Sequence, residues 1–290
     1  MEAYLANLGV LICVYATLAI TLNFIMGYAG IYSLAHAVFF GVGAYTGGYI
    51  ALNYTASVFV TVPAAMVAAA VLSLVLAIPT LRVRGEYFVA ASLGLQILAV
   101  TLFTEWKSFT GGIGGLVGIP PLDVAGVEVF RPVSFLIVTA VALVVVIVLV
   151  NLLIRSNFGR SLRAIRDSES AAAAFGKNVP VIKTVSLAIS AALAGSVGAL
   201  YASYLSFINV ESFVLDTSVL IMAMVIIGGT GTQLGPIVGA IVLLSLPSLI
   251  SYMDFLPQSE IGAIQQIIYG AGMTLLMLFR PGGIIGSGGK

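Results

Sequence analysis

Charged residues are scarce in this sequence. Asp, Glu, Lys and Arg make up 8% of its 290 residues, whereas hydrophobic residues make up 60% and the mean hydropathy is +1.16. Soluble domains carry roughly 25% charged residues, so the composition excludes an ordinary soluble protein and indicates one that lies in a lipid bilayer. The formal net charge of +1 offers no basis for binding nucleic acid.

Cysteine and histidine are almost missing too, since Cys13 and His36 are the single residues of each type. One cysteine cannot form an internal disulfide, and one His with one Cys cannot build a metal-binding cluster from those residue types. A lone His without a nearby intramembrane carboxylate cannot complete a catalytic triad either. We therefore expect no metal site and no catalytic residues in this chain.

Long apolar runs fill most of the sequence. A helical span needs about 20 apolar residues, and the runs predict an all-α polytopic membrane protein of about nine (eight to ten) transmembrane helices in a single domain, 1–290. Two of the runs, 32–52 and 216–231, are glycine-rich or short, and either could be re-entrant or broken. The predicted spans are 5–26, 32–52, 57–79, 86–104, 132–154, 184–206, 216–231, 234–252 and 261–279.

Basic residues indicate the orientation of the chain, because cytoplasmic loops carry an excess of Lys and Arg. They gather in the segments 82–84, 155–183 and 280–290. An even number of predicted spans separates these segments, so all three can lie in the cytoplasm. This arrangement predicts an external N-terminus, a cytoplasmic C-terminus and external loops at 105–131 and 207–215.

The predicted spans contain almost no ionisable group, and His36 is the one titratable residue well inside a span. Such groups form proton relays, ion sites and voltage sensors, so their scarcity argues against a proton-coupled pump and a voltage-gated channel. Sodium coupling stays open, because backbone carbonyls at unwound helices can bind that ion. The glycine cluster GTGTQLG at 229–235 lacks the lysine of a phosphate-binding loop. Energy for uphill transport would therefore come from a separate ATPase subunit.

Half of the twelve basic residues lie in one polar segment, 155–183, which we expect to form a cytoplasmic coupling loop. Residues 161–175 suit a short helix with Leu162, Ile165, Glu169 and Ala172 on one face. A helix of this length is marginal in water, so a partner surface would help to hold it. The alternative is an ordinary cytoplasmic loop whose arginines face water and lipid headgroups.

Local charges support that helix. Arg163 with Asp167 and Arg166 with Glu169 have the spacing of helical ion pairs, worth about 0.2–0.5 kcal/mol each. Gly176 is placed to end the helix in the left-handed conformation.

The sequence resembles the LivM-type permease subunit of branched-chain amino acid ABC importers. The likeness runs from about residue 5 to 286 and rests on blocks in the family's order. These are GYAGIYSLAHAVFFGVGAY (27–45), PTLRVRGEYF (79–88), TGGIGGLVGIP (110–120), GRSLRAIRDSESAAAAFGKNVPVIKTVSLAISAALAGSVGALYASY (159–204), GGTGTQLGPIVGA (228–240) and FRPGGIIG (279–286).

The resemblance implies a helical permease in the inner membrane of a bacterial or archaeal cell. It also implies partners: a second, related (LivH-like) permease subunit, two ATPase subunits that bind ATP and Mg, and an extracytoplasmic substrate-binding protein. No cofactor is expected in this chain. In the family, the loop carries a coupling helix that binds the ATPase. Its matching positions here are Gly159, Arg160, Arg163, Ala164, Arg166, Asp167, Glu169, Ala172 and Gly176.

Several polar or glycine positions are candidates for the translocation pathway, although buried polar side chains also join helices to one another. The glycines near residue 43 additionally resemble seams of close helix packing. The pathway candidates are Asn23, Ser33, His36, Tyr45, Thr110, Gly111, Gly112, Gly228, Gly229 and Gly231.

The favoured function is the membrane subunit of an ATP-driven importer that moves branched-chain amino acids or a related small polar solute by alternating access. Urea, short amides and aromatic or aliphatic acids stay open as substrates. An ion-coupled secondary transporter and a passive channel are the alternatives from other classes.

Overall fold

The computed structural model describes residues 2–80, 86–251, 267–268, 270–272, 274–275 and 282–285. Its long helices are α1 (Glu2–Ala29), α2 (His36–Asn53), α3 (Val58–Thr80), α4 (Glu86–Glu105), α6 (Pro132–Arg155), α9 (Val179–Leu205), α10 (Leu215–Gly228) and α11 (Gly235–Ser251). The shorter elements are α5 (Lys107–Thr110), η1 (Gly112–Gly114), β1 (Leu116–Val117), β2 (Leu122–Val124), β3 (Val127–Val129), α7 (Asn157–Asp167), α8 (Glu169–Ala174), β4 (Phe207–Ile208) and η2 (Val210–Phe213).

The helices confirm a polytopic all-α membrane protein. Within the described residues, six helical segments are long and apolar enough to cross a membrane: Tyr4–Ala29, Val58–Val75, Tyr87–Glu105, Pro132–Arg155, Val179–Leu205 and Val210–Gly228. The predicted span 261–279 lies largely outside the described residues, as do Arg82, Arg84 and Arg280, on which the orientation depends. The exact number of spans and the orientation therefore stay predictions.

The two glycine-rich or short runs do not behave like the other spans. Residues 30–35 are not helical, and α2 begins at His36 beside Thr21 of α1, whose hydroxyl lies 2.9 Å from His36 Nε2. Because α1 continues to Ala29, the start of α2 lies more than one helical turn inside the end of α1. The second run forms α10, which ends at Gly228 and is preceded by the short helix η2.

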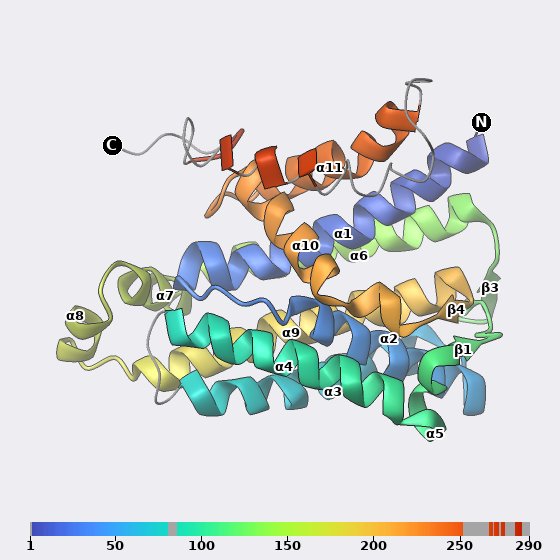
Figure 1. The fold of residues 1–290 in the computed structure, drawn as a ribbon, viewed down its shortest axis with the longest axis horizontal. Helices are drawn as coiled ribbons and strands as arrows, with labels where there is room; N and C mark the ends of the chain where they lie inside the picture. Colours follow the sequence, from blue (N-terminus) through green and yellow to red (C-terminus); the bar gives the residue numbers. More distant parts are fainter. Residues whose placement is uncertain are drawn as a thin grey trace.

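The helices form a buried centre and an outer layer. Sixteen of the 27 residues of α9 are buried, against five of the 24 residues of α6, and α3 is mostly uncovered as well. Helices α2, α3 and α9 pack against one another, while α1 contacts α6, α9, α10 and α11 (Figure 1). The apolar faces of α3 and α6 that protein leaves uncovered suit contact with lipid.

Close packing of α2 against α9 depends on residues with small side chains or none. A Cβ on Gly43 would overlap the backbone of Gly195, and a Cβ on Gly198 would overlap the Phe40 carbonyl. Gly47 faces Ala199 at a similarly short distance. This confirms the predicted packing seam, in which small residues let two membrane helices approach closely.

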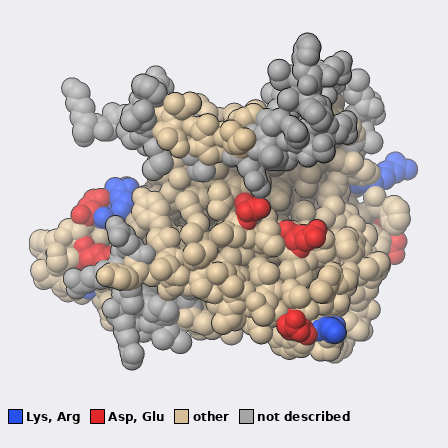
Figure 2. Space-filling model, in the orientation of Figure 1, with Lys and Arg blue, Asp and Glu red and all other residues tan. Residues whose placement is uncertain are grey.

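The two ends of the helix bundle differ. At one end, β1 pairs antiparallel with β4, which joins the predicted external loops 105–131 and 207–215, and β2 pairs with β3. The opposite end carries α7 and α8 (Figure 1). Charged side chains of both signs lie at the α7–α8 end and also toward the opposite end of the visible face, and most of the surface between them is uncharged (Figure 2).

Candidate functional site

The coupling loop begins at a tight turn between α6 and α7. Ser156 caps α7 by accepting hydrogen bonds at Oγ from the amides of Phe158 and Gly159, at 3.2 and 3.5 Å. A Cβ on Gly159 would overlap the carbonyl group of Ile154. The Arg163 guanidinium donates to the same Ile154 carbonyl at 3.1 Å, which satisfies a carbonyl near the end of α6. Gly159 and Arg163 therefore fix the angle at which α7 leaves the membrane helix.

The loop contains two helices, so the prediction of one helix over 161–175 was wrong. The chain is extended at Ser168, which has φ −162° and ψ 112°, and the Ser168 hydroxyl accepts from the Ala171 amide at 3.3 Å to cap α8. A serine hydroxyl offers the backbone a hydrogen bond that competes with the helical one. The predicted left-handed end at Gly176 is confirmed, with φ +75°.

The hydrophobic members of the predicted face are all buried, but they lie on two helices rather than on one. Leu162, Ile165 and Ala172 are buried, and Ile165 and Ala172 pack with Val179 of α9. Glu169 is half-buried. The remaining loop candidates are exposed at the surface: Arg160, Arg163, Ala164, Arg166, Asp167 and Gly176.

Neither predicted ion pair forms among the residues that the structure describes. Arg166 pairs instead with Asp167, at 3.0 Å, and Glu169 pairs with Lys183 of α9. The break at Ser168 prevents the Arg166–Glu169 pair, because it carries Glu169 out of the helical register of α7 and toward α9. Arg163 and Asp167 stay in one helix, but Arg163 donates to the Ile154 carbonyl and Asp167 accepts from Arg166. Arg160 bonds to the Asn157 side chain within α7.

Arg166 connects α7 to the end of α1. Its Nη1 donates to the Gly27 carbonyl at 2.9 Å, and its Nε and Nη2 donate to Asp167 Oδ1 at 3.1 and 3.0 Å. Gly30 has φ +69°, and a Cβ there would lie 3.1 Å from Arg166 Cγ. The Arg166 side chain therefore packs directly on the turn that follows α1.

The same end of α1 contacts the turn between α10 and α11. The Asn23 side chain donates to the Thr232 carbonyl at 2.7 Å and accepts from the Gly231 amide at 2.8 Å. A Cβ on Gly27 would overlap the Gly231 backbone. These contacts bring together α7, the end of α1 and the α10–α11 turn.

The segment 282–285 completes this end of the structure. The amides of Ile284 and Ile285 donate to the carbonyls of Ile227 and Gly228, at 2.9 and 3.1 Å. Gly283 packs against Gly229, and a Cβ on Gly283 would overlap the Gly229 backbone. The predicted pathway residues Asn23, Gly228, Gly229 and Gly231 thus lie at the α7–α8 end, next to the coupling loop.

A second group of predicted pathway residues lies in the interior, with Ser33 and His36 at the start of α2 and Tyr45 in its middle. Besides its contact with Thr21, His36 is fully buried, and Ser33 Oγ accepts from the Ala35 amide at 3.3 Å. Tyr45 packs between Phe103 and Phe213, with ring centroids 4.9 and 5.5 Å away.

The third group lies at the opposite end, in the 105–131 loop. Thr110 Oγ1 donates to the Phe103 carbonyl at 2.6 Å and accepts from the Gly112 amide at 3.1 Å. Gly111 is left-handed, with φ +75°, and ends α5. The ten candidates therefore occupy three separate places along the bundle, and their assignment to a pathway stays a prediction.

The sequence analysis missed a buried polar cluster beside the start of α2. Gln96 donates to the Phe213 carbonyl at 2.8 Å and accepts from the Ser218 hydroxyl at 3.3 Å, and Ser218 accepts from the Ala37 amide at 2.9 Å. Ser92 accepts from the Leu34 amide at 2.9 Å. A glutamine within an apolar span indicates that polar partners surround it, because a buried amide without partners costs free energy.

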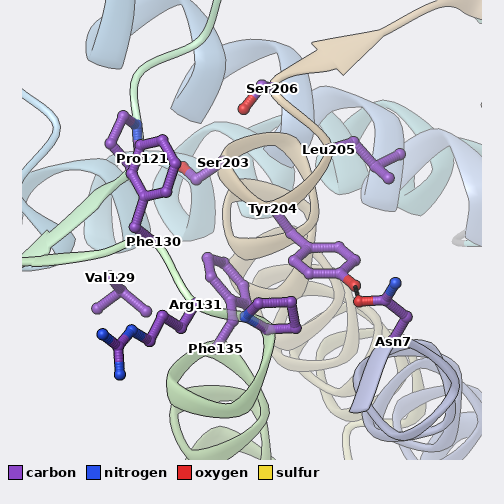
Figure 3. A pocket seen from close by; sticks show the side chains of 11 residues that line it. Asn7, Pro121, Val129, Phe130, Arg131, Phe135, Ser203, Tyr204, Leu205 and Ser206 are labelled. Atoms are coloured by element: carbon purple, nitrogen blue, oxygen red, sulfur yellow. Dashed lines mark hydrogen bonds between the residues drawn. The ribbon is translucent and has the colours of Figure 1, made fainter. Parts of the chain in front are cut away.

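A cavity of about 320 Å³ lies at the opposite end from the coupling loop. It lies where α1, α6 and α9 meet, and Tyr204 donates to Asn7 Oδ1 across one side at 2.7 Å (Figure 3). Among the described residues, no group of three His, Cys, Asp or Glu side chains could hold a metal ion.

Comparison with known proteins agrees with this architecture. The family model described as the permease component of the branched-chain amino acid transport system matches residues 4–278. The high-affinity branched-chain amino acid transport system permease protein LivM of Escherichia coli K12 is 30% identical over 302 residues, which cover 96% of this chain and 69% of that relative. Its Salmonella typhimurium counterpart is 29% identical with the same coverage.

An archaeal relative is more distant. The probable branched-chain amino acid transport permease protein LivM of Methanocaldococcus jannaschii is 24% identical over 93% of this chain and 90% of its own length. No solved structure matches the chain. The names of the relatives confirm a transport subunit of the cell membrane rather than an enzyme. The chain belongs to the family of permease components of branched-chain amino acid transport systems.

Proposed function

We propose that the chain is a membrane subunit of an ATP-driven importer that moves branched-chain amino acids into the cell by alternating access. The relatives are named for this solute, and the family description names a permease component of a larger transport system. The proposed partners are a second, related permease subunit, two ATPase subunits that bind ATP and Mg, and an extracytoplasmic substrate-binding protein.

The surface of α7 and α8 is the observation that carries the proposal. Phe175, at the end of α8, is 86% exposed, and Ala171, Ala173 and Ala174 are exposed beside it. This small apolar patch lies on the helix that packs against α7, and α7 carries the exposed residues Arg160, Arg163 and Arg166. Aromatic residues and arginine are both enriched at protein interfaces.

The loop is also held firmly enough to transmit force. Its helices are capped by Ser156 and Ser168, and α9 begins with a cap from Asn178, whose side chain accepts from the Val181 amide at 3.3 Å. The Glu169–Lys183 pair fastens α8 to α9. A loop that is ordered before its partner arrives loses less conformational entropy on binding.

The energetic role follows from linkage. A partner can shift a conformational equilibrium only through its different affinities for the two states. We infer that closed and open ATPase dimers hold α7–α8 in different positions. The helices then tilt so that the solute site faces alternate sides of the membrane, while ATP hydrolysis takes place on the partner subunits.

A pair of substitutions tests the docking surface. Phe175→Asp should abolish copurification of the ATPase subunits, because it places a charge in the centre of the apolar patch. Val127→Asp is the matched control, since Val127 is 67% exposed on β3 at the opposite end; it should leave copurification unchanged. Normal recovery of the ATPases with Phe175→Asp in a folded, membrane-inserted protein would contradict the proposed docking surface.

A further inference from the structure

We propose that Arg166 is a positioning residue that transmits movement of the coupling loop directly to the end of α1 and the α10–α11 turn. This route would act beside the covalent connections of the loop to α6 and α9. The inference rests on the proposed function, because it concerns how the movement of an ATPase partner reaches the membrane helices.

Arg166 lies on α7 but donates to a carbonyl on another membrane helix, Gly27 of α1. Arg163 instead bonds to Ile154 at the end of α6, the helix that leads into α7, and Arg160 bonds to Asn157 within α7. Of these three arginines, Arg166 is therefore the one that links the loop to a distant part of the chain.

The geometry suits a firm contact. Gly27 lies in the last turn of α1, where helical carbonyls have no partner within the helix and where a cation is favoured by the helix dipole. The guanidinium also bonds to Asp167 through Nε and Nη2. Because the guanidinium is planar, the bonds to Asp167 fix the direction in which Nη1 points. A lysine could place a charge near Gly27, but it could not reproduce this fork of three N–H donors, in which two bind Asp167 and one binds Gly27.

The connection continues from Gly27 into the α10–α11 turn through backbone contacts. With no side chains at Gly27 and Gly231, the two backbones lie directly against each other, and the Asn23 amide holds the turn from the other side. Closely packed groups transmit displacement rather than absorbing it. Movement of Arg166 should therefore move the end of α1 and this turn together.

The segment 282–285 extends the same unit. Its two amide hydrogen bonds fasten it to the end of α10. A pull on α7 would thus reach α1, α10 and α11 at one place. Docking and transmission become separable, because the docking patch around Phe175 lies on α8 and the transmitting contact lies on α7.

The experiment uses the complete importer reconstituted in lipid vesicles with its ATPases and substrate-binding protein. Arg166→Gln removes the charge and the fork, and Arg166→Lys keeps the charge alone. Arg131→Gln is the matched control, because it removes the same charge from an exposed residue directly before α6, at the end of the bundle opposite to α7 and α8. ATPase copurification, ATP hydrolysis and leucine uptake are measured for each variant.

We expect Arg166→Gln to keep copurification and hydrolysis but to lower the uptake per ATP hydrolysed by about tenfold, the loss expected for one charge-assisted hydrogen bond. Arg166→Lys should recover part of the uptake, and Arg131→Gln should match the unmodified protein. Unchanged uptake per ATP in Arg166→Gln, or an equal loss in Arg131→Gln, would overturn the inference. Loss of copurification in Arg166→Gln would also overturn it, by making Arg166 a docking residue.

A direct readout of movement excludes a merely structural role. In a Cys13→Ser background, Leu234→Cys places a thiol in the α10–α11 turn, where Leu234 is 62% exposed. Its reaction rate with a membrane-impermeant maleimide should change when a non-hydrolysable ATP analogue is added, and Arg166→Gln should remove that change. A nucleotide response that persists in Arg166→Gln contradicts the route. Absence of ATP-dependent uptake by the unmodified complex would instead refute the proposed function itself.

Discussion

The α2–α9 seam and the contact between α7 and the end of α1 join helices by different means. At the seam, Gly43 meets Gly195 and Gly198 meets the Phe40 carbonyl, so the backbones themselves are in contact. At α7, one guanidinium reaches across to one carbonyl of Gly27. The first contact depends on shape alone, and the second on a single charged side chain.

This difference indicates which part of the molecule can move. Interdigitated backbones cannot slide past one another without separating, since protein interiors are close-packed. A side-chain hydrogen bond can break and form again with a new partner at small net cost, because water or another carbonyl can replace the one lost. We therefore expect α2 and α9 to move as one body, and the coupling-loop end to rearrange around them.

The largest effect on stability should come from a side chain that forces α2 and α9 apart. Gly43→Leu should destabilise the protein by about 3 kcal/mol or more, because the new side chain must occupy space held by the Gly195 backbone of α9. Thermal unfolding in detergent measures the effect. Gly94→Leu is the control, since a Cβ at this exposed position of α4 meets no atom within 4 Å. Equal melting temperatures for both variants would show that the seam is not closely packed.

The next largest effect should come from the turn at the start of the coupling loop. Gly159→Ala forces a Cβ onto the Ile154 carbonyl, so it should cost about 1–3 kcal/mol and weaken ATPase binding by misdirecting α7. Copurification and thermal unfolding together measure this. Gly114→Ala, at a site with open space around it, should change neither quantity. Full ATPase binding by Gly159→Ala would mean that the turn does not set the position of α7.

A smaller effect is expected where a side chain, rather than a backbone, joins two segments. Asn23→Ala leaves the Gly231 amide and the Thr232 carbonyl without their side-chain partner, and should cost about 1–3 kcal/mol. Asn53→Ala is the control, because Asn53 is exposed and bonds only to Tyr49 of its own helix turn. If both variants unfold at the same temperature, Asn23 does not hold the α10–α11 turn.

The smallest effect should come from the ion pair between α8 and α9. The Lys183 side chain is 11% exposed and the Glu169 side chain 36% exposed. Glu169→Gln leaves the more buried Lys183 charge unpaired, so it should destabilise the protein more than Lys183→Met does. We expect the loss for Glu169→Gln to be roughly 1 kcal/mol after screening by solvent. A double-mutant cycle followed by chemical unfolding measures the coupling. A larger loss of stability for Lys183→Met would show that an unpaired Glu169 carboxylate costs more than an unpaired Lys183 ammonium group.

The membrane helices could be predicted from the sequence because they depend on local apolar runs. The predicted span 132–154 corresponds to α6, Pro132–Arg155, and Gly43 and Gly47 of the predicted glycine seam do pack on α9. Their partners on α9, Gly195 and Ala199, were not predicted. The predicted span 184–206 was shorter than α9, which begins at Val179 in the polar part of the loop. Hydropathy cannot reveal that extension, because it comes from a capped helix continuing into water.

The coupling loop could be predicted only in part. The buried face of Leu162, Ile165 and Ala172 follows from helical spacing, but the break at Ser168 and the new partners of Arg166 and Glu169 depend on where α1 and α9 lie. The short strands β1 and β4 belong to segments far apart in the sequence. Their pairing is a tertiary contact with no local pattern to indicate it.

The most direct test of the account is uptake by vesicles that contain the permease with and without its ATPase subunits. We predict that this chain, alone or with its second permease subunit, does not concentrate leucine. Adding the ATPases, the substrate-binding protein and ATP should produce accumulation against the gradient. Accumulation by the permease without any ATPase would contradict the account, because this chain would then supply its own driving force.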